Sequence, residues 1–357
     1  MEKIDILGVK IDNFSKFEAL GVVERFLSDG GQHYIVTPNP EMVVLAQKDT
    51  EFKKILNEAD LAIPDGSGLI FASRILAREE SKVLNKLEQE KCYSSSELPR
   101  LAGASREALK ERIHGVDFMV DLLILAETID KSVYFLGGAP QVAKKLALQI
   151  NPPTFPQSIQ SGRNDGVCVS CPSSPWRYHG VFGKGGGVKE KFPNLKIVGA
   201  DDGGKINANG AGDRDEETIK LINEANPDIL FVAFGHGSNA DWISGQGKQE
   251  KWIKMNLKKM PSVKIAMGVG GAFDFLSGKV IRAPKILREL NLEWLWRLVS
   301  EPRRFKRIFN AVIVFPYLVL QFRIKRLRKS ENCESAKTPT PPLPLSEGEG
   351  REGEKIS

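Results

Sequence analysis

The chain has 357 residues, of which 41% are hydrophobic and 27% are charged, and it carries a formal net charge of +6 at pH 7. This length allows one large or two smaller domains with a buried core, and the composition is ordinary for a soluble globular protein. The four scattered cysteines do not resemble a disulfide framework, and the first residues, MEKIDILGVKIDNF, lack the pattern of a signal peptide. We therefore expect a reducing, cytoplasmic environment.

The charge is unevenly distributed along the chain. Residues 282–329 contain thirteen Lys or Arg and three Glu, a net charge of +10, so the remainder of the chain carries −4. Such a basic segment predicts an anionic partner, either nucleic acid or acidic lipid. No stretch reaches the ~18–20 apolar residues of a membrane-spanning helix. The nearest, residues 309–322, is short and is interrupted by Pro316.

Strand and helix patterns alternate along most of the chain. Apolar runs typical of strands occupy residues 3–9, 33–37, 61–63, 132–136, 196–198, 229–233 and 265–269, and helical patterns occupy residues 14–27, 42–56, 67–76, 139–149 and 216–225. Strands that alternate with helices predict an α/β fold, with a mostly parallel, Rossmann-like sheet and helices on both faces.

Three segments interrupt this alternation. Residues 78–110 are highly charged, and we interpret them as an inserted helical hairpin or loop. Residues 151–187, rich in Pro, Ser and Gly, predict a poorly ordered insertion, and residues 330–357 predict a low-complexity tail without a fold. The expected organisation is an α/β body over residues 1–290, a basic helical appendage over 291–329, and this tail.

Two polar loops follow strands of the predicted sheet. The sequence TPNPE, with Thr37 and Asn39, follows one strand, and PDGSG, with Asp65, follows another. Ligands of an open parallel sheet bind beyond the carboxyl ends of its strands, so these two loops can meet at one crevice. Asp65 would then be placed to accept a proton. The other interpretation is that Asp65 or Ser67 caps the following helix, and the spacing alone favours the cap.

Glycines follow two further strands. The sequence FLGG, with Gly137 and Gly138, precedes a helix and suits either a bound phosphate or a simple tight turn. The sequence GVGGAFDF, with Val269 and Asp274, places an acid where it could bind a ribose hydroxyl or a base edge, or cap a glycine turn. The run Gly183–Gly187 lacks the ending of a phosphate-binding loop and lies in the predicted insertion.

Eight segments occur in an order that a known family shares: TPNPE (37–41), IPDGSG (63–68), ERIHGVDFM (111–119), FLGG (135–138), FPNLKIVG (192–199), KQEKWI (248–253), GVGGAFDFLSGKVIRAP (268–284) and LEWLWRLVSEPRRFKR (292–307). Together they resemble the TagA/WecG/CpsF family of glycosyltransferases. The resemblance implies an inverting transfer of N-acetylmannosamine, or a related sugar, from a UDP-sugar to a lipid-linked acceptor such as N-acetylglucosamine on undecaprenyl diphosphate. It implies no cofactor, and it implies self-association through the body.

The resemblance also implies roles for individual residues. Asp65 is the expected general base on the acceptor hydroxyl, with Thr37 and Asn39 in the same pocket. The motif order thus makes catalysis the preferred interpretation of Asp65. The residues expected to bind substrate are Arg112, Gly137, Gly138, Gln249, Glu250, Val269, Asp274, Arg297, Arg304 and Arg307.

Two other motifs have the residue types of metal sites. Asp213-Arg-Asp215 formally matches the Asp-x-Asp of metal-dependent transferases, but we interpret it as a solvated helix start, where acids are favoured. Cys168 and Cys171, with His179, supply fewer than the four ligands of a structural zinc site. Because arginines can stabilise the departing UDP without a metal, we predict that no metal is bound.

The chain departs from the family pattern at residues 245–250, where the usual Gly-x-Pro-Lys-Gln-Glu is GQGKQE, and residues 236–244 form an apparent insertion. Losing the proline loosens a loop expected near the nucleotide, which leaves the affinity for the donor open. Two other functions stay open as well. One is a non-catalytic UDP-sugar-binding membrane protein, and the other is a nucleotide-dependent oxidoreductase, against which the missing dinucleotide fingerprint argues.

Aromatic residues accompany the basic charge of the appendage. Between residues 292 and 328, Trp, Phe and Tyr interleave with Lys and Arg, as in segments that lie at a membrane interface. The alternative is that the apolar face packs on the body or on a second subunit. No nucleic-acid-binding module accompanies the charge. Because the acceptor that the resemblance implies is itself lipid-linked, we predict peripheral attachment to the cytoplasmic face of the membrane and no nucleic-acid partner.

Overall fold

A computed structural model describes residues 3–89, 107–151, 192–234, 247–281, 283–284, 286–287, 290, 292–302 and 305–335. Several features singled out above lie outside these residues. They are Cys168, Cys171, His179, the run Gly183–Gly187, the insertion over 236–244, and Arg304.

Six parallel strands form the central sheet, in the order β4-β3-β8-β7-β5-β6. They are β3 (His33–Val36), β4 (Leu61–Ala62), β5 (Ser132–Gly137), β6 (Lys196–Asp201), β7 (Ile229–Ala233) and β8 (Ile265–Gly268). The predicted parallel α/β sheet is confirmed. Over residues 3–9 we predicted one strand, but an antiparallel hairpin of β1 (Lys3–Ile6) and β2 (Val9–Asp12) occurs there, because Leu7 and Gly8 take positive φ values and turn the chain back.

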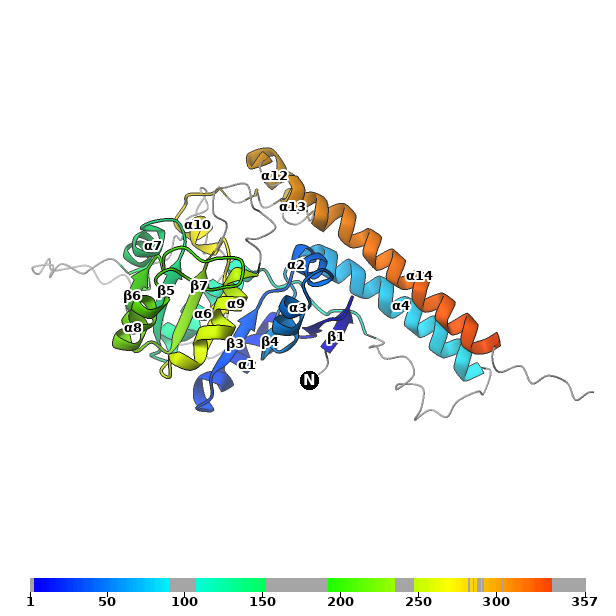
Figure 1. Ribbon diagram of the computed structural model, residues 1–357, viewed down its shortest axis with the longest axis horizontal. Helices are drawn as coiled ribbons and strands as arrows, with labels where there is room; N and C mark the ends of the chain where they lie inside the picture. The colour runs from blue at the N-terminus through cyan, green and yellow to red at the C-terminus, as the bar shows by residue number, and fades with distance from the viewer. Residues whose placement is uncertain are drawn as a thin grey trace, which may run out of the picture.

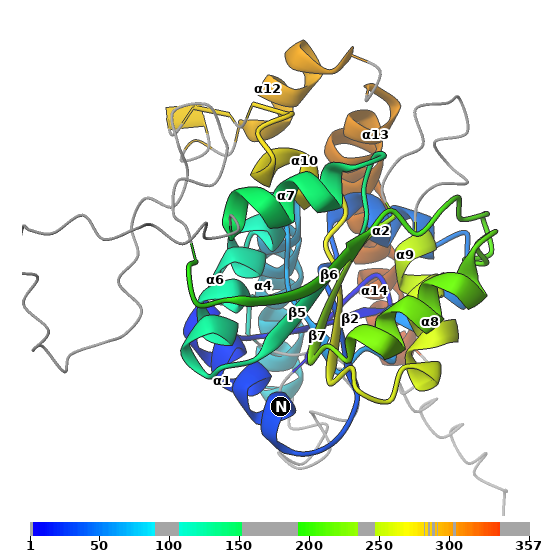
Figure 2. The ribbon, with the colours of Figure 1, turned by 90° about the vertical axis from the view of Figure 1, so that its left-hand side faces the viewer.

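Helices cover both faces of this sheet, as predicted (Figure 2). One face carries α1 (Lys16–Ser28), α6 (Gly115–Thr128), α7 (Val142–Ile150) and α10 (Ala272–Leu276). The other carries α2 (Pro40–Ala46), α3 (Thr50–Asn57), α4 (Ser67–Gln89), α8 (Asp215–Ala225), and α9 (Lys248–Asn256) with its 3-10 extension η1 (Leu257–Lys259).

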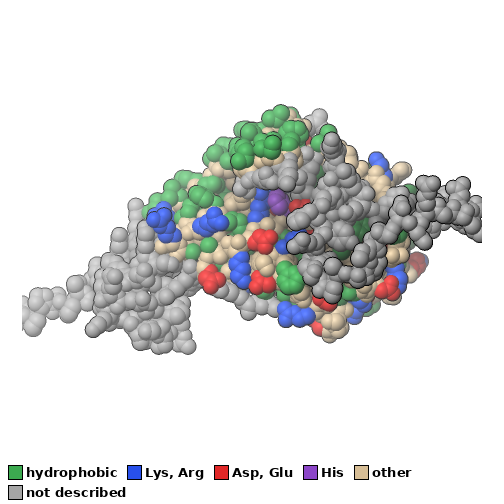
Figure 3. All heavy atoms as spheres, turned by 180° about the vertical axis from the view of Figure 1, so that it is seen from behind, with side chains coloured by type: hydrophobic (Ala, Val, Ile, Leu, Met, Phe, Trp, Pro, Cys, Tyr) green, Lys and Arg blue, Asp and Glu red, His purple; other side chains and the backbone are tan. Residues whose placement is uncertain are grey.

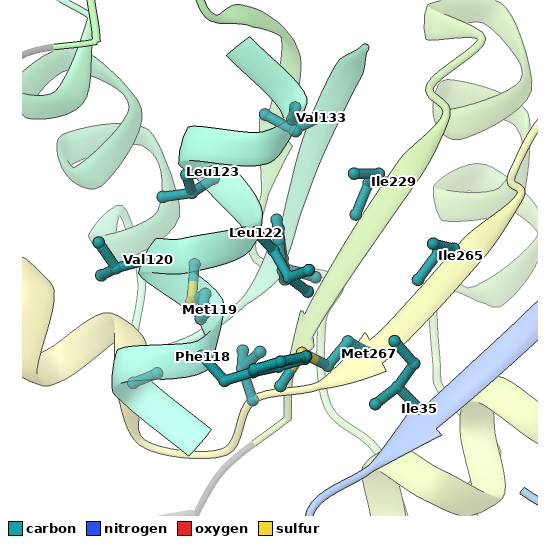
Figure 4. Close-up of a cluster of buried hydrophobic side chains, with 14 of the residues drawn as sticks. Ile35, Phe118, Met119, Val120, Leu122, Leu123, Val133, Ile229, Ile265 and Met267 are labelled. Carbon is teal, nitrogen blue, oxygen red and sulfur yellow. The ribbon is translucent and has the colours of Figure 1, made fainter. Parts of the chain in front are cut away.

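The strands supply apolar residues to both faces in alternation. Ile35 belongs to the cluster beneath α1 and α6, whereas its neighbours Tyr34 and Val36 belong to the cluster beneath α3 and α9. Figure 4 shows side chains of α6, Phe118 and Leu122 among them, pointing toward the strands. The sequence analysis does not predict α6, because its apolar residues run almost continuously and so obscure the helical period.

The helix predicted over residues 42–56 is in fact two helices. Oδ1 of Asn39 accepts a hydrogen bond of 2.9 Å from the backbone N–H of Met42 and caps α2. Oδ1 of Asp49 accepts one of 2.9 Å from Phe52 and caps α3. Each cap starts a new helix, so the chain turns between α2 and α3. Asn39 stays at the edge of the sheet.

The C-terminal appendage is helical, as predicted. It consists of α12 (Glu293–Ser300), α13 (Phe305–Phe309), the π-helical turn η3 (Asn310–Val314) and α14 (Phe315–Ser335). Pro316 was expected to interrupt this segment, but α13, η3 and α14 form one continuous helix. The π turn explains the difference, because Phe315 donates its N–H to the carbonyl of Asn310 and the chain enters α14 with Pro316 in its first turn.

This long helix lies beside α4, and the two extend together from the body (Figure 1). Phe315 and Val319 are buried in the contact, so one face of the appendage packs on the body. Residues 305–325 are also long and apolar enough, by length and composition, to cross a membrane, and only 11% of the relevant window is buried. The expectation that no such stretch exists is therefore wrong. Helix α14 also extends to Ser335, into the segment predicted to have no fold.

The turn after β5 gives a test of the fold. Gly137 has φ +99°, and a Cβ added to it would lie 2.7 Å from the carbonyl carbon of Ala233 at the end of β7. We expect Gly137→Ala to lower the free energy of unfolding by about 2 kcal/mol or more, since both the backbone and the neighbouring strand must shift. The measurement is chemical denaturation.

Gly21→Ala is the matched control for this substitution. Gly21 lies in the middle of α1, is exposed, and an added Cβ there meets nothing within 4 Å. We expect this change to stabilise the protein by about 0.5–1 kcal/mol, because alanine restricts the unfolded chain more than glycine does. Equal effects from the two substitutions would contradict the strained geometry assigned to the β5 turn.

Candidate functional site

A cleft of about 740 Å³ lies where the body meets the appendage. Its walls come from the loops after β3 and β4, the start of α4, the segment before α6, and the helices α10, α12 and α13 with η3. Of the residues predicted to form the site, Asn39, Asp65, Arg112, Arg297 and Arg307 line this cleft. In Figure 3 acidic, basic and histidine side chains gather on this face below the apolar surface over α12.

Asp65 and Thr37 lie together at the ends of two neighbouring strands. Strand β3 pairs directly with β4, and the backbone N–H of Asp65 donates to the carbonyl of Pro38 over 2.9 Å. A Cβ added to Gly115, the first residue of α6, would lie 3.4 Å from Oδ2 of Asp65 and 3.5 Å from Oγ1 of Thr37. The parallel sheet thus brings the two loops to one point, as the strand-end argument predicted.

The alternative to catalysis was that Asp65 or Ser67 caps the helix that follows. The capping side chain found in these two loops is that of Asn39. The Asn39 side chain caps α2, as described above, so its Oδ1 is already engaged. In contrast, the Asp65 carboxylate accepts no hydrogen bond from any residue that the structure describes, including the backbone at the start of α4. Asp65 therefore presents its oxygens to the cleft, while the predicted catalytic role of Asn39 stays a prediction.

Three cationic or basic side chains surround one carboxylate beside Asp65. Glu293, at the start of α12, accepts from Nη2 of Arg112 over 3.4 Å and from Nη2 of Arg297 over 3.3 Å. Nδ1 of His114 lies 3.2 Å from the same nitrogen of Arg112 and 3.8 Å from Glu293. Because Glu293 is only 9% exposed, this network fixes α12 against the segment before α6.

Burial and these charges change how the acids and bases of the cleft titrate. Burial raises the pKa of Asp65 above its usual value. The positive charges of His114, when it is protonated, and of Arg112 offset part of that rise. Burial also lowers the pKa of His114, with the Arg112 guanidinium as the next cause. A carboxylate with a raised pKa that faces a cleft is suited to accept a proton near neutral pH.

Arg307 is held at the opposite wall by an ion pair. Its Nε and Nη2 donate to the two carboxylate oxygens of Glu41 over 2.6 and 2.8 Å. Both side chains are largely buried, at 17% and 10% exposure. This two-pronged contact joins α13 to α2 directly behind the Asn39 loop.

Other predicted residues lie at the ends of the central strands. Gly137 ends β5 and Val269 follows β8, while Gly138 donates its N–H to the carbonyl of Ala233 over 2.8 Å. Since that N–H is already used, the geometry supports the tight-turn interpretation of Gly138. Asp274 lies on α10, where it forms an ion pair of 3.5 Å with Lys279.

Gln249 and Glu250 hold the loop after β8. Oε1 of Gln249 accepts from the N–H of Gly270 over 3.0 Å, and its Nε2 donates to Oε1 of Glu250 over 2.7 Å. Glu250 is 2% exposed, and burial raises its pKa. The two side chains therefore position the loop that carries Val269, and contact with a substrate stays a prediction for both.

The Asp213-Arg-Asp215 motif lies at a helix start, as predicted, but its acids are not free. Oδ1 of Asp213 accepts from the N–H of Lys205 over 2.8 Å. The carboxylate of Asp215, which begins α8, accepts from Gly212 over 2.8 Å and from the Trp252 indole over 2.7 Å. Within the described ranges, no three His, Cys, Asp or Glu side chains form a group that could hold a metal ion.

Sequence reasoning missed three residues of the cleft, His114, Glu41 and Glu293. His114 lies in the ERIHG motif next to Arg112, and Glu41 lies in TPNPE, so both were within quoted motifs. Glu293 is the second residue of the C-terminal motif. Their membership of these motifs was the available signal. Only the docked appendage shows that Glu41 and Glu293 meet arginines from distant parts of the chain, and that His114 lies beside Glu293.

Comparisons with known proteins identify the family of this chain. The family described as "Glycosyl transferase WecG/TagA/CpsF family" matches residues 4–88 and 186–329. A protein of Staphylococcus aureus strain MRSA252 named N-acetylglucosaminyldiphosphoundecaprenol N-acetyl-beta-D-mannosaminyltransferase is 25% identical over 334 residues, which cover 92% of this chain and 96% of the relative. The protein of the same name from strain MW2 is 24% identical over the same coverage.

The family match covers more than half of the chain. It includes the loops of Thr37 and Asp65, and it includes the appendage from α12 to residue 329 of α14. The chain therefore belongs to the WecG/TagA/CpsF family of glycosyltransferases.

Proposed function

We propose that this chain transfers N-acetylmannosamine, or a closely related sugar, from a UDP-sugar to N-acetylglucosamine carried on a polyprenyl diphosphate. The named relatives act on such an acceptor, and they match this chain over nearly its whole length. The observation that carries the proposal is the Asp65 carboxylate, half-buried at the end of β4, without a hydrogen-bond partner among the described residues and facing a cleft rich in arginine.

The proposed reaction is a single displacement with inversion. Asp65 removes the proton from the acceptor hydroxyl, and that oxygen forms a bond to the anomeric carbon of the donor sugar. The bond between this carbon and the β-phosphate oxygen breaks, and UDP leaves with the electron pair. The guanidinium groups of Arg112, Arg297 and Arg307 stabilise the negative charge that develops on the diphosphate.

The nucleotide is proposed to lie along the ends of β5, β7 and β8. These strands are adjacent in the sheet, so Gly137 and Val269 end at the same edge as Thr37 and Asp65. Helix α10 links the two regions, because Asp274 precedes Phe275, whose ring lies 4.8 Å from the Arg297 guanidinium. Arg304 is proposed to act with Arg307, and self-association through the body stays a prediction.

Asp65→Asn tests the proposed base. The substitution keeps the shape of the side chain and removes its basicity, so we expect kcat to fall about 10²- to 10⁴-fold while UDP binding is retained. Release of UDP in the presence of the acceptor lipid measures turnover, and calorimetry measures UDP binding.

Asp130→Asn is the matched control. Asp130 pairs with Lys196 at the surface and is 73% exposed, far from the cleft in the chain and at the opposite end of β5. We expect its turnover to equal that of the unmodified protein. Turnover of Asp65→Asn at the level of this control would refute the role of Asp65.

The pH dependence of kcat/KM should show the charges around Asp65. Because only the ionised carboxylate accepts a proton, activity falls as pH drops through the raised pKa of Asp65. Arg112 lowers that pKa and Glu293 raises it. Arg112→Gln is therefore expected to move the acidic limb to higher pH, and Glu293→Gln to lower pH. His114 and Arg297, which also lower the Asp65 pKa, stay in place in both variants. Limbs that move in the same direction would contradict this electrostatic assignment.

The appendage is proposed to attach the protein to the cytoplasmic face of the membrane. Large apolar side chains of the long helix remain exposed although the opposite face packs on the body, among them Ile313, Tyr317, Leu320 and Ile324. Arg323 and Lys325 lie on the same helix, so apolar and basic groups occur together as they do at a lipid interface.

Arg323→Gln with Lys325→Gln is expected to weaken binding to phosphatidylglycerol vesicles roughly 30-fold, because each of the two cations near an anionic surface contributes about 1 kcal/mol. The charge-matched control is Lys220→Gln with Lys258→Gln, on α8 and η1 away from the appendage. Sedimentation with vesicles measures binding. Salt at about 1 M, which shortens the Debye length to about 3 Å, should release the protein. Retention at that salt concentration would indicate a helix that spans the bilayer instead.

A further inference from the structure

The cleft changes in chemical character from one wall to the other. Asp65, Arg112 and His114 form a charged region at the end of the sheet. The opposite part, between α4 and the continuous helix of α13, η3 and α14, is lined by Ile70, Phe71, Ile308, Ala311, Val312 and Pro316. We call these six residues the apolar groove. Arg74 lines the cleft one turn from Phe71 on α4, and Arg307 lies one residue before Ile308, so cations border the groove.

The groove is formed by the docking of the appendage. Phe315 is buried against the start of α4, where a Cβ added to Gly68 would lie 3.6 Å from its ring. The Arg307–Glu41 ion pair holds the other side of the same helix on α2. These two contacts therefore fix the distance between α4 and η3. The groove between them is a consequence of how the appendage is docked.

Apolar surface remains exposed inside and beside this groove. Phe71 is 61% exposed although it lines the cleft, and the neighbouring Phe309 and Ile313 are 45% and 53% exposed. The π turn of η3 places the small side chain of Ala311 toward the cleft, and such turns are frequent at functional sites. An apolar surface of this kind, rimmed by cations, indicates a ligand with both hydrocarbon and anionic parts.

We propose that the apolar groove binds the first isoprene units of the polyprenyl chain of the acceptor. The inference rests on the proposed function. An acceptor of this class has a sugar, a diphosphate and a hydrocarbon in that order, and the cleft offers a base, arginines and apolar side chains in the same order. The acceptor hydroxyl lies at Asp65, the diphosphate of the acceptor lies beside Arg74 at the border of the groove, and the hydrocarbon lies between α4 and η3.

The continuity of the cleft favours the acceptor chain over a bulk membrane lipid. The groove and the Asp65 region belong to one cavity of about 740 Å³, so hydrocarbon in the groove is connected to whatever is bound at the base. The outward-facing side of α14, with Tyr317 and Leu320, is a separate surface and remains available to the bilayer. Binding to the acceptor chain and binding to the membrane are therefore distinguishable by substitution.

Ala311→Trp tests the groove by filling it. Two acceptors are compared, N-acetylglucosaminyl diphosphate on undecaprenol in mixed micelles, and the same sugar diphosphate on an ethyl group. We expect the substitution to raise KM for the undecaprenyl acceptor about tenfold or more, since a buried hydrocarbon contact is lost. KM for the ethyl acceptor and for the donor should change less than about twofold.

Leu148→Trp is the matched control, because it adds the same ring at an exposed position of α7, outside both the cleft and the appendage. It should leave KM for both acceptors unchanged, and vesicle binding of both variants should equal that of the unmodified protein. Val312→Thr reports on the same groove with little change in volume, in case tryptophan prevents folding. It should also raise KM for the undecaprenyl acceptor alone.

Three results would overturn the proposal that the groove binds the polyprenyl chain. One is an equal rise in KM for both acceptors, another is no preference of the unmodified protein for the undecaprenyl acceptor, and the third is a loss of vesicle binding in Ala311→Trp. Absence of turnover with either acceptor would instead refute the proposed function. The groove is then tested by equilibrium binding of undecaprenyl diphosphate in mixed micelles, which Ala311→Trp should weaken about tenfold if the groove holds the chain.

Discussion

The two hydrogen bonds between Arg307 and Glu41 are the contact on which the site depends, because they hold the appendage over the edge of the sheet. Without the appendage, the carboxyl ends of β3 and β4 would form an open edge with Asp65 at the surface. With it, α12 and α13 supply the second wall, and Asp65 becomes a half-buried carboxylate in a cleft. Burial of Phe315 and Val319 against α4 supports the same arrangement through apolar contact. The chemistry of the body therefore depends on the position of the appendage. The raised pKa of Asp65 follows from the burial that the complete fold produces.

The charges of the cleft are arranged around an excess of cations. Glu293 accepts from Arg112 and Arg297, and these hydrogen bonds help to hold the two guanidinium groups in place. A fixed cation stabilises developing negative charge better than a mobile one, because it needs no reorganisation when the reaction occurs. The same carboxylate belongs to the appendage, so docking and preorganisation of the arginines occur together. His114, with its pKa lowered by burial, adds a ring that is neutral over a wider pH range and lies against Arg112.

Particular residues show where sequence reasoning succeeded and where it did not. Thr37 and Asp65 were expected to meet because both follow parallel strands, and β3 and β4 are indeed neighbours in the sheet. The helix predicted over 42–56 is divided because Asn39 and Asp49 each cap a separate helix, a local choice that apolar spacing does not reveal. Helix α6 lacked a periodic signal because it is buried on most sides. Pro316 was expected to interrupt a helix, but the preceding π turn, which packs against α2, accommodates it.

The sequence by itself determined the class of fold and the residues of the two loops, because the alternation of strands and helices and the order of eight motifs are properties of the chain alone. It also determined the basic character of the appendage. Only the tertiary structure decided which polar side chains face the cleft and which serve the backbone, so that Asn39 caps a helix while the carboxylate of Asp65 is left without a partner among the described residues. It also decided that Glu41 and Glu293 meet arginines more than a hundred residues away. The physical reason is that these contacts arise from the packing of helices on a shared sheet edge, and no local pattern records the distance between them.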